Sequence, residues 1–223
     1  MQLKAIDLTK EFIRESKNTN RFTAVDDITL TLNGGELTVL MGRSGSGKTT
    51  LLNMLSGLLL PTGGKVMLDD KDIYTLPDRE LSRLRNKSFG VIPQGQTAIQ
   101  SLSTLENILL PIKLYGKVSD DDNKAALKLM QRLDIAHLSA ARPAELSGGE
   151  LRRMAIARAV IKTPDIIFAD EPTGDLDDEN TEEVFSFLKE YAASGKCVFV
   201  VTHENDAKDF ADRLLTMSKG KIE

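Results

Sequence analysis

Met41-Gly42-Arg43-Ser44-Gly45-Ser46-Gly47-Lys48-Thr49-Thr50 lies between an apolar run at 37–41 and a helical pattern of leucines at 51–58. It contains a glycine, four further residues and then Gly-Lys-Thr, and a strand before it and a helix after it are the context that a phosphate-binding loop requires. Its glycines let consecutive backbone N–H groups turn toward a phosphate, where the helix N-terminus adds positive potential. We therefore predict that residues 42–50 hold the phosphates of a nucleotide.

Two side chains of this loop have predicted tasks. Lys48 would place a mobile positive charge at the β- and γ-phosphates. The Thr49 hydroxyl would be one ligand of a Mg²⁺ ion that bridges those phosphates. The alternative is a glycine-rich turn that precedes a helix by chance, and the surrounding strand and helix pattern disfavours it.

The composition is that of a globular protein, with 223 residues, 41% hydrophobic residues and a net charge of −4. Because the basic residues form no concentrated run, nucleic acid is not expected as a main partner. No eighteen apolar residues run together and the N-terminus lacks the apolar core of a signal peptide, so we expect a chain that neither crosses a membrane nor is exported. The single cysteine, Cys197, lies in an apolar run, so it is expected to be buried, and the absence of a disulfide framework suits the cytosol.

The first part of the chain is predicted to form an antiparallel β flank. Apolar and polar residues alternate over 2–8 and over 23–32, which is typical of half-buried strands. Phe12 and Phe22 could each offer a stacking face to an adenine ring, and Phe12 is the candidate that we retain. The alternative, that a lone aromatic residue in a strand belongs to the core, is the more common case.

Polar side chains follow three predicted strands. Gln94 follows 89–92, Asp170 and Glu171 follow 165–169, and His203 follows 197–201. Open α/β sheets place their sites at the carboxyl ends of the strands, although Gln94 alone would more often be a loop residue and His203 alone serves packing as often as function. Adjacent residues of an extended chain point in opposite directions, so we expect Asp170 to reach Mg²⁺ and Glu171 to face the attacking water.

Between residues 95 and 163 the pattern is helical. Helices are predicted at 105–114 and at 119–133, and together they indicate an inserted helical subdomain. A third helix, from 147 to 162, begins with Ser147 and Glu150 in the spacing of a capping box. Capping alone could explain that pair, but Gly148 and Gly149 are costly at a helix start unless something approaches the backbone closely. They indicate a second helix N-terminus that meets a phosphate.

The ordered set of these motifs resembles the ATP-binding subunits of ABC transporters over the whole chain. By that resemblance, residues 42–49 are the Walker A loop, Gln94 is the Q-loop glutamine, residues 147–150 are the signature, Asp170 and Glu171 are Walker B and the catalytic base, Asp175 to Asp177 are the D-loop, and His203 is the switch histidine. The resemblance implies a P-loop NTPase of α/β fold with an antiparallel β flank and a helical subdomain at 95–163, inserted between core segments at 1–94 and 164–223.

The resemblance also implies an activity and partners. ATP and Mg²⁺ are the expected substrate and cofactor, Glu171, His203, Gln94 and Lys48 are the expected catalytic residues, and Thr49, Gln94 and Asp170 are the expected metal ligands. In this family the signature of one subunit closes over the nucleotide held by the other, so a homodimer is expected. Its partner would be a separately encoded integral-membrane permease, which would hold the chain on the inner face of the cell membrane.

Within that family, residues 103–111 and 170–174 look like the lipoprotein-release, macrolide-export and antimicrobial-peptide group. The chain departs from the group's pattern at Leu151-Arg152-Arg153, where glutamines are usual, at Asp175, at Phe12, and over 95–100, where members meet their membrane partner. Two alternatives remain within the ATPases: a complex for cell division or peptide sensing, and an ATPase acting on nucleic acid or ribosomes, which would usually carry a coiled-coil insertion or a second nucleotide domain. A regulatory module without turnover is disfavoured by the presence of Glu171 and His203.

Overall fold

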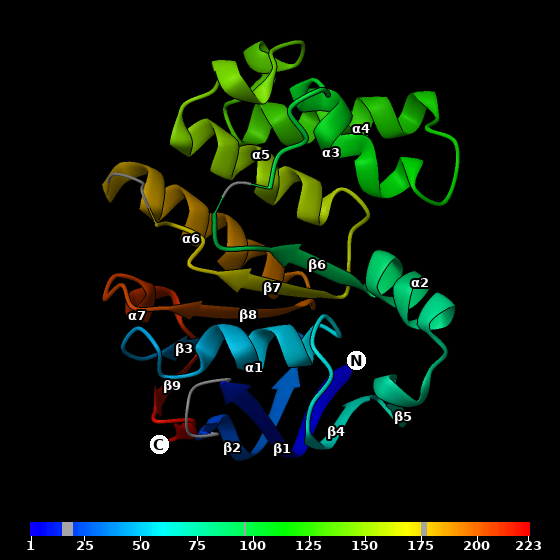
Figure 1. Cartoon of the computed structure of the whole chain (residues 1–223). Coiled ribbons are helices and arrows are strands. Elements are labelled where there is room, and N and C mark those ends of the chain that lie inside the picture. Colours follow the sequence, from blue (N-terminus) through cyan, green and yellow to red (C-terminus); the bar gives the residue numbers. More distant parts are fainter. Residues whose placement is uncertain (15–19, 96, 175–177) are drawn as a thin grey trace.

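The computed structural model describes residues 1–14, 20–95, 97–174 and 178–223, and within them the strands form two sheets (Figure 1). The first sheet has the order β2-β1-β4-β5 and the second the order β10-β9-β3-β8-β7-β6. The strands of the first sheet are β1 (Gln2–Arg14), β2 (Asn20–Asn33), β4 (Gly63–Leu68) and β5 (Lys71–Asp72). Those of the second are β3 (Leu37–Met41), β6 (Phe89–Ile92), β7 (Ile166–Asp170), β8 (Cys197–Thr202), β9 (Arg213–Ser218) and β10 (Lys221–Ile222).

The central strands β3, β7 and β8 are buried along their whole length and run parallel. Helices cover both faces of this sheet, which explains why its strands are continuous apolar runs in the sequence. The helices are α1 (Lys48–Leu55), α2 (Asp78–Ser88), α3 (Thr104–Lys113), α4 (Asp120–Arg132), α5 (Gly148–Val160), α6 (Asp178–Ala193) and α7 (Ala207–Phe210). Short 3₁₀ turns occur at Ile73–Thr75, Ala136–Leu138 and Pro143–Glu145.

Two apolar clusters form the core. The leucines of α1 pack between the antiparallel sheet and one face of the parallel sheet, where Phe168 and Phe199 are fully buried. On the other face, α6 and the helices α3, α4 and α5 share a single cluster with the strands. Because this cluster runs through both parts, the division of the chain at residues 94 and 164 stays a prediction.

The predicted antiparallel flank is present, but its strands are longer than the alternating pattern indicated. β1 and β2 pair antiparallel from Gln2 opposite Asn33 to Arg14 opposite Asn20, with register shifts after Ala5, Leu8 and Lys10. Backbone φ values of 51° at Asp7 and 53° at Asp27 accompany these irregularities. A bulge inserts an extra residue and reverses the alternation of faces, so a simple period of two does not reveal the extension beyond residue 8.

The helices agree with the predicted ranges to within a few residues. Ser103 and Ser119 form capping boxes at the starts of α3 and α4, and α5 ends at Val160, two residues before the predicted end. The prediction left α2 as a charged stretch, because few of its residues are apolar and Leu81 is its only buried hydrophobic residue. In the part of the chain that the structure describes, we find no helix with the length and apolar character needed to cross a bilayer.

Candidate functional site

The predicted phosphate loop connects the end of β3 to the start of α1. Gly47 is the residue before α1, with a φ of 110°, and a Cβ at this position would lie 2.1 Å from the carbonyl oxygen of Ala24. A side chain here would therefore force the loop and β2 apart. Since glycine has no side chain to cap the helix, the first N–H groups of α1 are left for a ligand.

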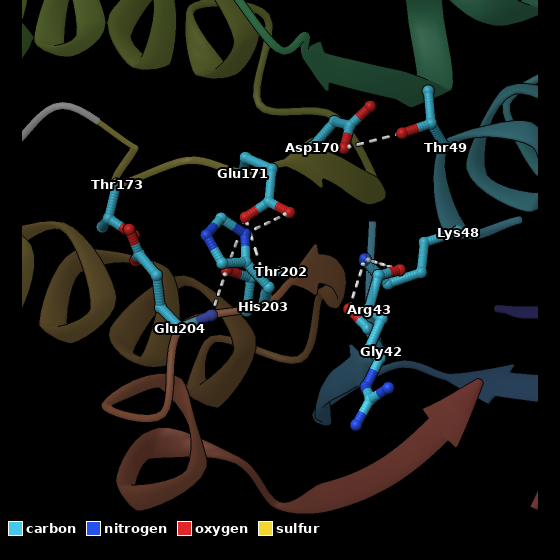
Figure 2. A network of polar contacts seen from close by, with 10 residues as sticks. All are labelled: Gly42, Arg43, Lys48, Thr49, Asp170, Glu171, Thr173, Thr202, His203 and Glu204. Carbon is cyan, nitrogen blue, oxygen red and sulfur yellow. Dashed lines mark hydrogen bonds and ion pairs between the residues drawn. The ribbon is translucent and has the colours of Figure 1, made fainter. Parts of the chain in front are cut away.

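Lys48 lies inside this loop and is only 7% exposed. Its ammonium group donates to the carbonyl oxygen of Gly42 at 2.7 Å and to that of Arg43 at 3.3 Å, as Figure 2 shows. The hydroxyl oxygen of Ser46, in the same loop, is buried and has no hydrogen-bond partner among the described residues. Buried polar groups are normally paired, so the loop has an unused polar atom as well as a cation to offer to a phosphate.

Thr49 and Asp170 bring two oxygen ligands together beside the loop. The Thr49 hydroxyl donates to Oδ1 of Asp170 at 3.2 Å, and Asp170 is 4% exposed. Burial raises the pKa of the Asp170 carboxyl, and the bond from Thr49 partly offsets that rise. A hydroxyl and a carboxylate are ligands that suit Mg²⁺, which keeps part of its coordination for phosphate and water. In the described ranges we find no group of three or more His, Cys, Asp or Glu side chains that could hold a metal ion. These ranges therefore offer no alternative of that kind to the predicted ligands Thr49, Gln94 and Asp170.

Glu171 is directed away from Asp170 and toward the end of β8 (Figure 2). Its Oε2 accepts a hydrogen bond from the Thr202 hydroxyl at 2.7 Å, and its Oε1 lies 2.9 Å from Nδ1 of His203. The two carboxylates thus have different partners, but the reason that we gave for this is wrong. Glu171 has a φ of 47° and is not part of an extended chain, so a sharp backbone turn directs its side chain.

The side chain of His203 is 67% exposed, and its contact with Glu171 raises its pKa. The backbone N–H of His203 also donates to Oε2 of Glu171 at 3.3 Å. Beside this pair, the Thr173 hydroxyl contacts the carboxylate of Glu204, whose N–H donates to the Thr202 hydroxyl at 3.1 Å. These contacts join the segment after β7 to the segment after β8.

These groups converge on one cleft of about 640 Å³. Its lining residues are Phe12, Phe22, Ala24, residues 43–50 of the phosphate loop, Gln94, Glu171 and His203. The structure therefore brings together side chains that follow three different strands, together with the loop. Phe12 and Phe22 are 38% and 44% exposed and lie opposite each other in the β1–β2 pair, so the alternative that they belong to the core is wrong. An adenine ring could stack on either of them.

The signature residues are not part of this cleft. Ser147 caps α5, where its hydroxyl accepts from the N–H of Glu150 and its own N–H donates to the Glu150 carboxylate at 2.7 Å. No residue from 147 to 149 lines the cleft as far as the described chain goes. The predicted D-loop, Asp175 to Asp177, lies outside the described residues.

The sequence analysis missed Thr202, although it holds the Glu171 carboxylate. Thr202 is the last residue of β8 and immediately precedes His203. The rule that singled out His203, a polar residue at a strand end, could have found it as well.

Comparison with known proteins places this geometry in a family. The sequence profile of the family described as ABC transporter matches residues 25–174. The lipoprotein-releasing system ATP-binding protein LolD of Psychrobacter arcticus is 37% identical over 223 residues, which cover 99% of this chain and 97% of that protein. The macrolide export ATP-binding/permease protein MacB of Chlorobaculum tepidum is 41% identical over 199 residues, which cover 89% of this chain and 30% of that protein. The chain thus spans about a third of the length of MacB.

Among solved structures, the dimeric post-hydrolysis state of an ATP-binding cassette bound to ADP and Pi superposes with a TM-score of 0.91. Its sequence is 33% identical to this one, and the match covers 99% of this chain and 97% of that chain. A dimeric bacterial ABC transporter cassette matches with a TM-score of 0.92 at 34% identity, over 99% of this chain and 96% of that chain. These likenesses confirm the predicted fold class.

Proposed function

This chain belongs to the family of ABC transporter ATP-binding subunits, which are ATPases, and we propose that the signature helix of a second copy completes its active site. The observation that carries this proposal is the position of Ser147. The cleft contains the phosphate loop, Gln94, Glu171 and His203, whereas none of its described lining residues comes from the N-terminus of α5. A second helix N-terminus with no phosphate within its own chain fits a nucleotide held by another chain.

Gly148 supports the same proposal. A Cβ at Gly148 would meet no atom within 4 Å in the described part of the chain, so none of the described residues requires a glycine there. Close approach of a partner's nucleotide would require one. The dimeric state of the two cassettes of similar fold agrees with such an arrangement.

Within the cleft, the residues of this chain have distinct tasks. The N–H groups at the start of α1 and the Lys48 ammonium bind the β- and γ-phosphates of ATP. Glu171 accepts the proton of the water that attacks the γ-phosphate, while Thr202 and His203 hold its carboxylate in place. Gln94 and His203, which line the same cleft, contact the γ-phosphate end.

Thr49 and Gln94, which line the cleft, and Asp170, which contacts the Thr49 hydroxyl beside it, would hold Mg²⁺. The fit rests on the 3.2 Å contact between the Thr49 hydroxyl and the Asp170 carboxylate, two hard oxygen donors beside the loop. A bound Mg²⁺ supplies neutralisation of the charge on the β- and γ-phosphate oxygens.

The dimer proposal is tested by the dependence of ATPase activity on protein concentration. If each site needs two chains, the rate per subunit rises with concentration between about 0.1 and 20 µM, the range of ordinary interface affinities, and then levels off. Ser147→Arg should remove this rise, because a bulky cation would occupy the place of the γ-phosphate contact. Ser194→Arg, on an exposed serine after α6, is the matched control and should leave the rise intact. A rate per subunit that is constant over this range, in both variants and the parent, would contradict the proposal.

The partner would be a separately encoded integral-membrane permease, of the lipoprotein-release or macrolide-export type that the relatives' names describe. Such a partner would hold the chain at the inner face of the membrane. An open cleft of about 310 Å³ is lined in part by the exposed side chains of Leu58, Leu114 and Tyr115, of which Leu114 is 65% exposed. Arg85 and Lys162 also line this cleft, so it suits an amphipathic helix with acidic residues.

The docking proposal is tested with a candidate permease reconstituted in lipid nanodiscs. Leu114→Asp should leave the basal ATPase activity unchanged and weaken binding to the nanodiscs at least about tenfold, because the apolar contact of Leu114 is lost and the new carboxylate repels the acidic residues of the docking helix. Leu127→Asp, which alters an exposed leucine of α4, should bind as the parent does. Equal binding by both variants would exclude this cleft as the docking site.

A further inference from the structure

Two arginines of α5 hold the segment that follows β6. The Arg152 guanidinium donates from Nη1 to the carbonyl oxygen of Pro93 at 2.8 Å, and Arg158 donates to the carbonyl oxygen of Thr97 at 2.9 Å. Gln94 lies between these two anchors and lines the nucleotide cleft. Pro93, before Gln94, and Thr97, after it, are therefore each hydrogen-bonded to the signature helix α5.

These bonds take the place of sheet pairing. β6 is an edge strand and ends at Ile92, and proline has no N–H with which to continue a ladder. The Pro93 carbonyl still needs a donor, and Arg152, which is only 8% exposed, supplies a charged one. Such a bond is stronger and more directional than one between neutral groups.

Further along, the same segment stays attached to the helices. The Asn107 side chain, on α3 and fully buried, accepts from the N–H of Ile99 and donates to the carbonyl oxygens of Ile99, Leu102 and Ser103. In Figure 1 the described residues from 97 onward pass beside α5 before α3 begins. A small cavity of about 40 Å³, lined by Gly95, Thr97, Gly148 and Arg152 among others, lies between this segment and the start of α5. Side-chain hydrogen bonds thus join this segment to α3 and to α5, beside a small cavity.

Arg152, which donates to Pro93, lies close to the N-terminus of α5. Arg152 is five residues after Ser147, which corresponds to about 7.5 Å along one rigid helix. Pro93 is bonded to Arg152 and is the residue before Gln94. A shift of the Gln94 backbone therefore reaches the N-terminus of α5 through one hydrogen bond and little more than one helical turn.

We propose that Arg152 is a positioning residue, which couples Gln94 in the nucleotide site of its own chain to Ser147 in the signature that serves the partner's site. The inference rests on the proposed function in one respect, namely that Ser147 meets a nucleotide on another chain. It assigns a task to a residue at which this chain departs from the glutamine usual in its family. Without the Arg152 bond, each chain still binds nucleotide, but only the Arg158 bond beyond Gln94 still joins this segment to α5, so the start of α5 follows Gln94 less closely.

The test separates nucleotide binding from dimerisation, because a purely structural role would affect both alike. In the Glu171→Gln background, Arg152→Met removes the donor at similar side-chain volume, and Arg152→Lys restores a cationic donor. Calorimetry with ADP, which lacks the γ-phosphate needed for dimerisation, should give affinities within about twofold of the parent for both variants. The ATP-dependent dimer of Arg152→Met should dissociate at least about tenfold more readily than that of the parent, and Arg152→Lys should recover most of this loss, because one charge-assisted bond has about this effect.

A matched control is Arg132→Met, on an arginine of α4 that pairs with Glu190 and lies over the Phe187 ring, away from the segment after β6. It should dimerise like the parent. Equal dimerisation by Arg152→Met and the parent overturns the coupling, even though the two-chain site itself stands. A parallel loss of ADP affinity in Arg152→Met overturns it too, because that result indicates a general loss of structure.

Hydrogen exchange measures whether Gln94 and the N-terminus of α5 are coupled, and it does not require the dimer. In the Glu171→Gln parent, diluted below the dimerisation range, ATP binding should slow amide exchange both in residues 97–99 and in residues 148–151. In Arg152→Met the slowing should be confined to residues 97–99. If the parent fails to dimerise with ATP, the two-chain proposal is wrong, and the exchange pattern alone then tests the link between the two segments. The same exchange pattern in the parent and in Arg152→Met overturns the coupling.

Discussion

The N-termini of α1 and α5 offer the most instructive comparison in this molecule. Both lie at glycine-containing motifs, but α1 begins after Gly47, which cannot cap it, whereas α5 begins at Gly148, after Ser147, which forms a full capping box with Glu150. A Cβ at Gly47 would lie 2.1 Å from the Ala24 carbonyl oxygen, while a Cβ at Gly148 would meet no described atom within 4 Å. The described residues around α1 leave no room for a side chain at Gly47, whereas those around α5 leave room for one at Gly148.

This difference shows which part of an anion site one chain can build alone. At α1, the surrounding residues supply a buried lysine, a buried hydroxyl and the walls of a cleft. At α5, Ser147 and Glu150 accept each other's N–H groups, and the described residues leave open space around Gly148. None of the described residues requires glycine at 148, so the proposed approach of a partner's nucleotide is what would require it.

The largest effect should come from the catalytic base on the α1 side. Glu171→Gln keeps the shape of the side chain and cannot accept the proton of the attacking water, so turnover should fall by about 10² to 10⁴ while ATP still binds. Steady-state ATPase assays and calorimetry measure the two quantities. Glu182→Gln, on an exposed glutamate of α6, is the control and should turn over like the parent. Turnover of Glu171→Gln within threefold of the parent would remove Glu171 from this role.

A smaller effect is expected for the cation in the phosphate loop. Lys48→Ala removes an ammonium group that is 7% exposed and held by the Gly42 carbonyl oxygen at 2.7 Å. The loss of a hydrogen bond from a charged group, about 1.5 to 3 kcal/mol, should weaken ATP binding by about 10- to 150-fold. Calorimetry of Lys48→Ala beside Lys65→Ala, an exposed lysine of β4, would show this. Equal ATP affinity in the two variants would contradict the assignment of the loop.

The contrast between the two glycines can be tested directly by stability. Gly47→Ala puts a methyl group against the Ala24 carbonyl oxygen at a φ of 110°, and the unfolding free energy should fall by about 1 to 3 kcal/mol. Gly148→Ala has open space and should change stability by no more than about 0.5 kcal/mol. Urea denaturation of the two variants gives both values. A loss in Gly148→Ala as large as that in Gly47→Ala would mean that the chain itself needs this glycine.

The smallest effect concerns the protonation of His203 beside Glu171. The hydrogen bond to the Glu171 carboxylate, and its negative charge, raise the His203 pKa above the ordinary value of 6.5. The charged pair is therefore complete below pH 6.5 and is lost as the pH rises through the raised pKa. With two histidines in the chain, NMR titration of a His137→Gln variant reports His203 alone. Adding Glu171→Gln should bring the midpoint back toward 6.5, and an unchanged midpoint would show that the pair does not form in solution.

Much of the site could be predicted because its signals are local. The phosphate loop is a continuous motif, and Gln94, Glu171 and His203 each follow an apolar strand. Since parallel strands end at a common edge, the three side chains had to converge once the strands were identified. The capping boxes of α4 and α5 are also local, because the bonded residues are three positions apart.

The remainder depends on how distant segments meet. Phe22 joins Phe12 at the cleft only because bulges shift the register of β1 against β2. Thr202 reaches Glu171 because β7 and β8 end side by side and because Glu171 turns at a φ of 47°. The bond from Arg152 to Pro93 joins residues 59 positions apart. Neither periodicity nor a motif encodes such contacts, since each results from the packing of a helix or strand against another part of the chain.

Light scattering after size exclusion measures whether two chains share each ATP, as we propose. Glu171→Gln saturated with ATP at tens of micromolar, about the range of ordinary interface affinities, should elute as a dimer with two nucleotides. With ADP, which lacks the γ-phosphate, it should elute as a monomer, and Ser147→Arg in the same background should stay monomeric with ATP. A Glu171→Gln protein that remains monomeric with ATP would contradict the shared site, and a Ser147→Arg form that still dimerises would exclude the N-terminus of α5 from it.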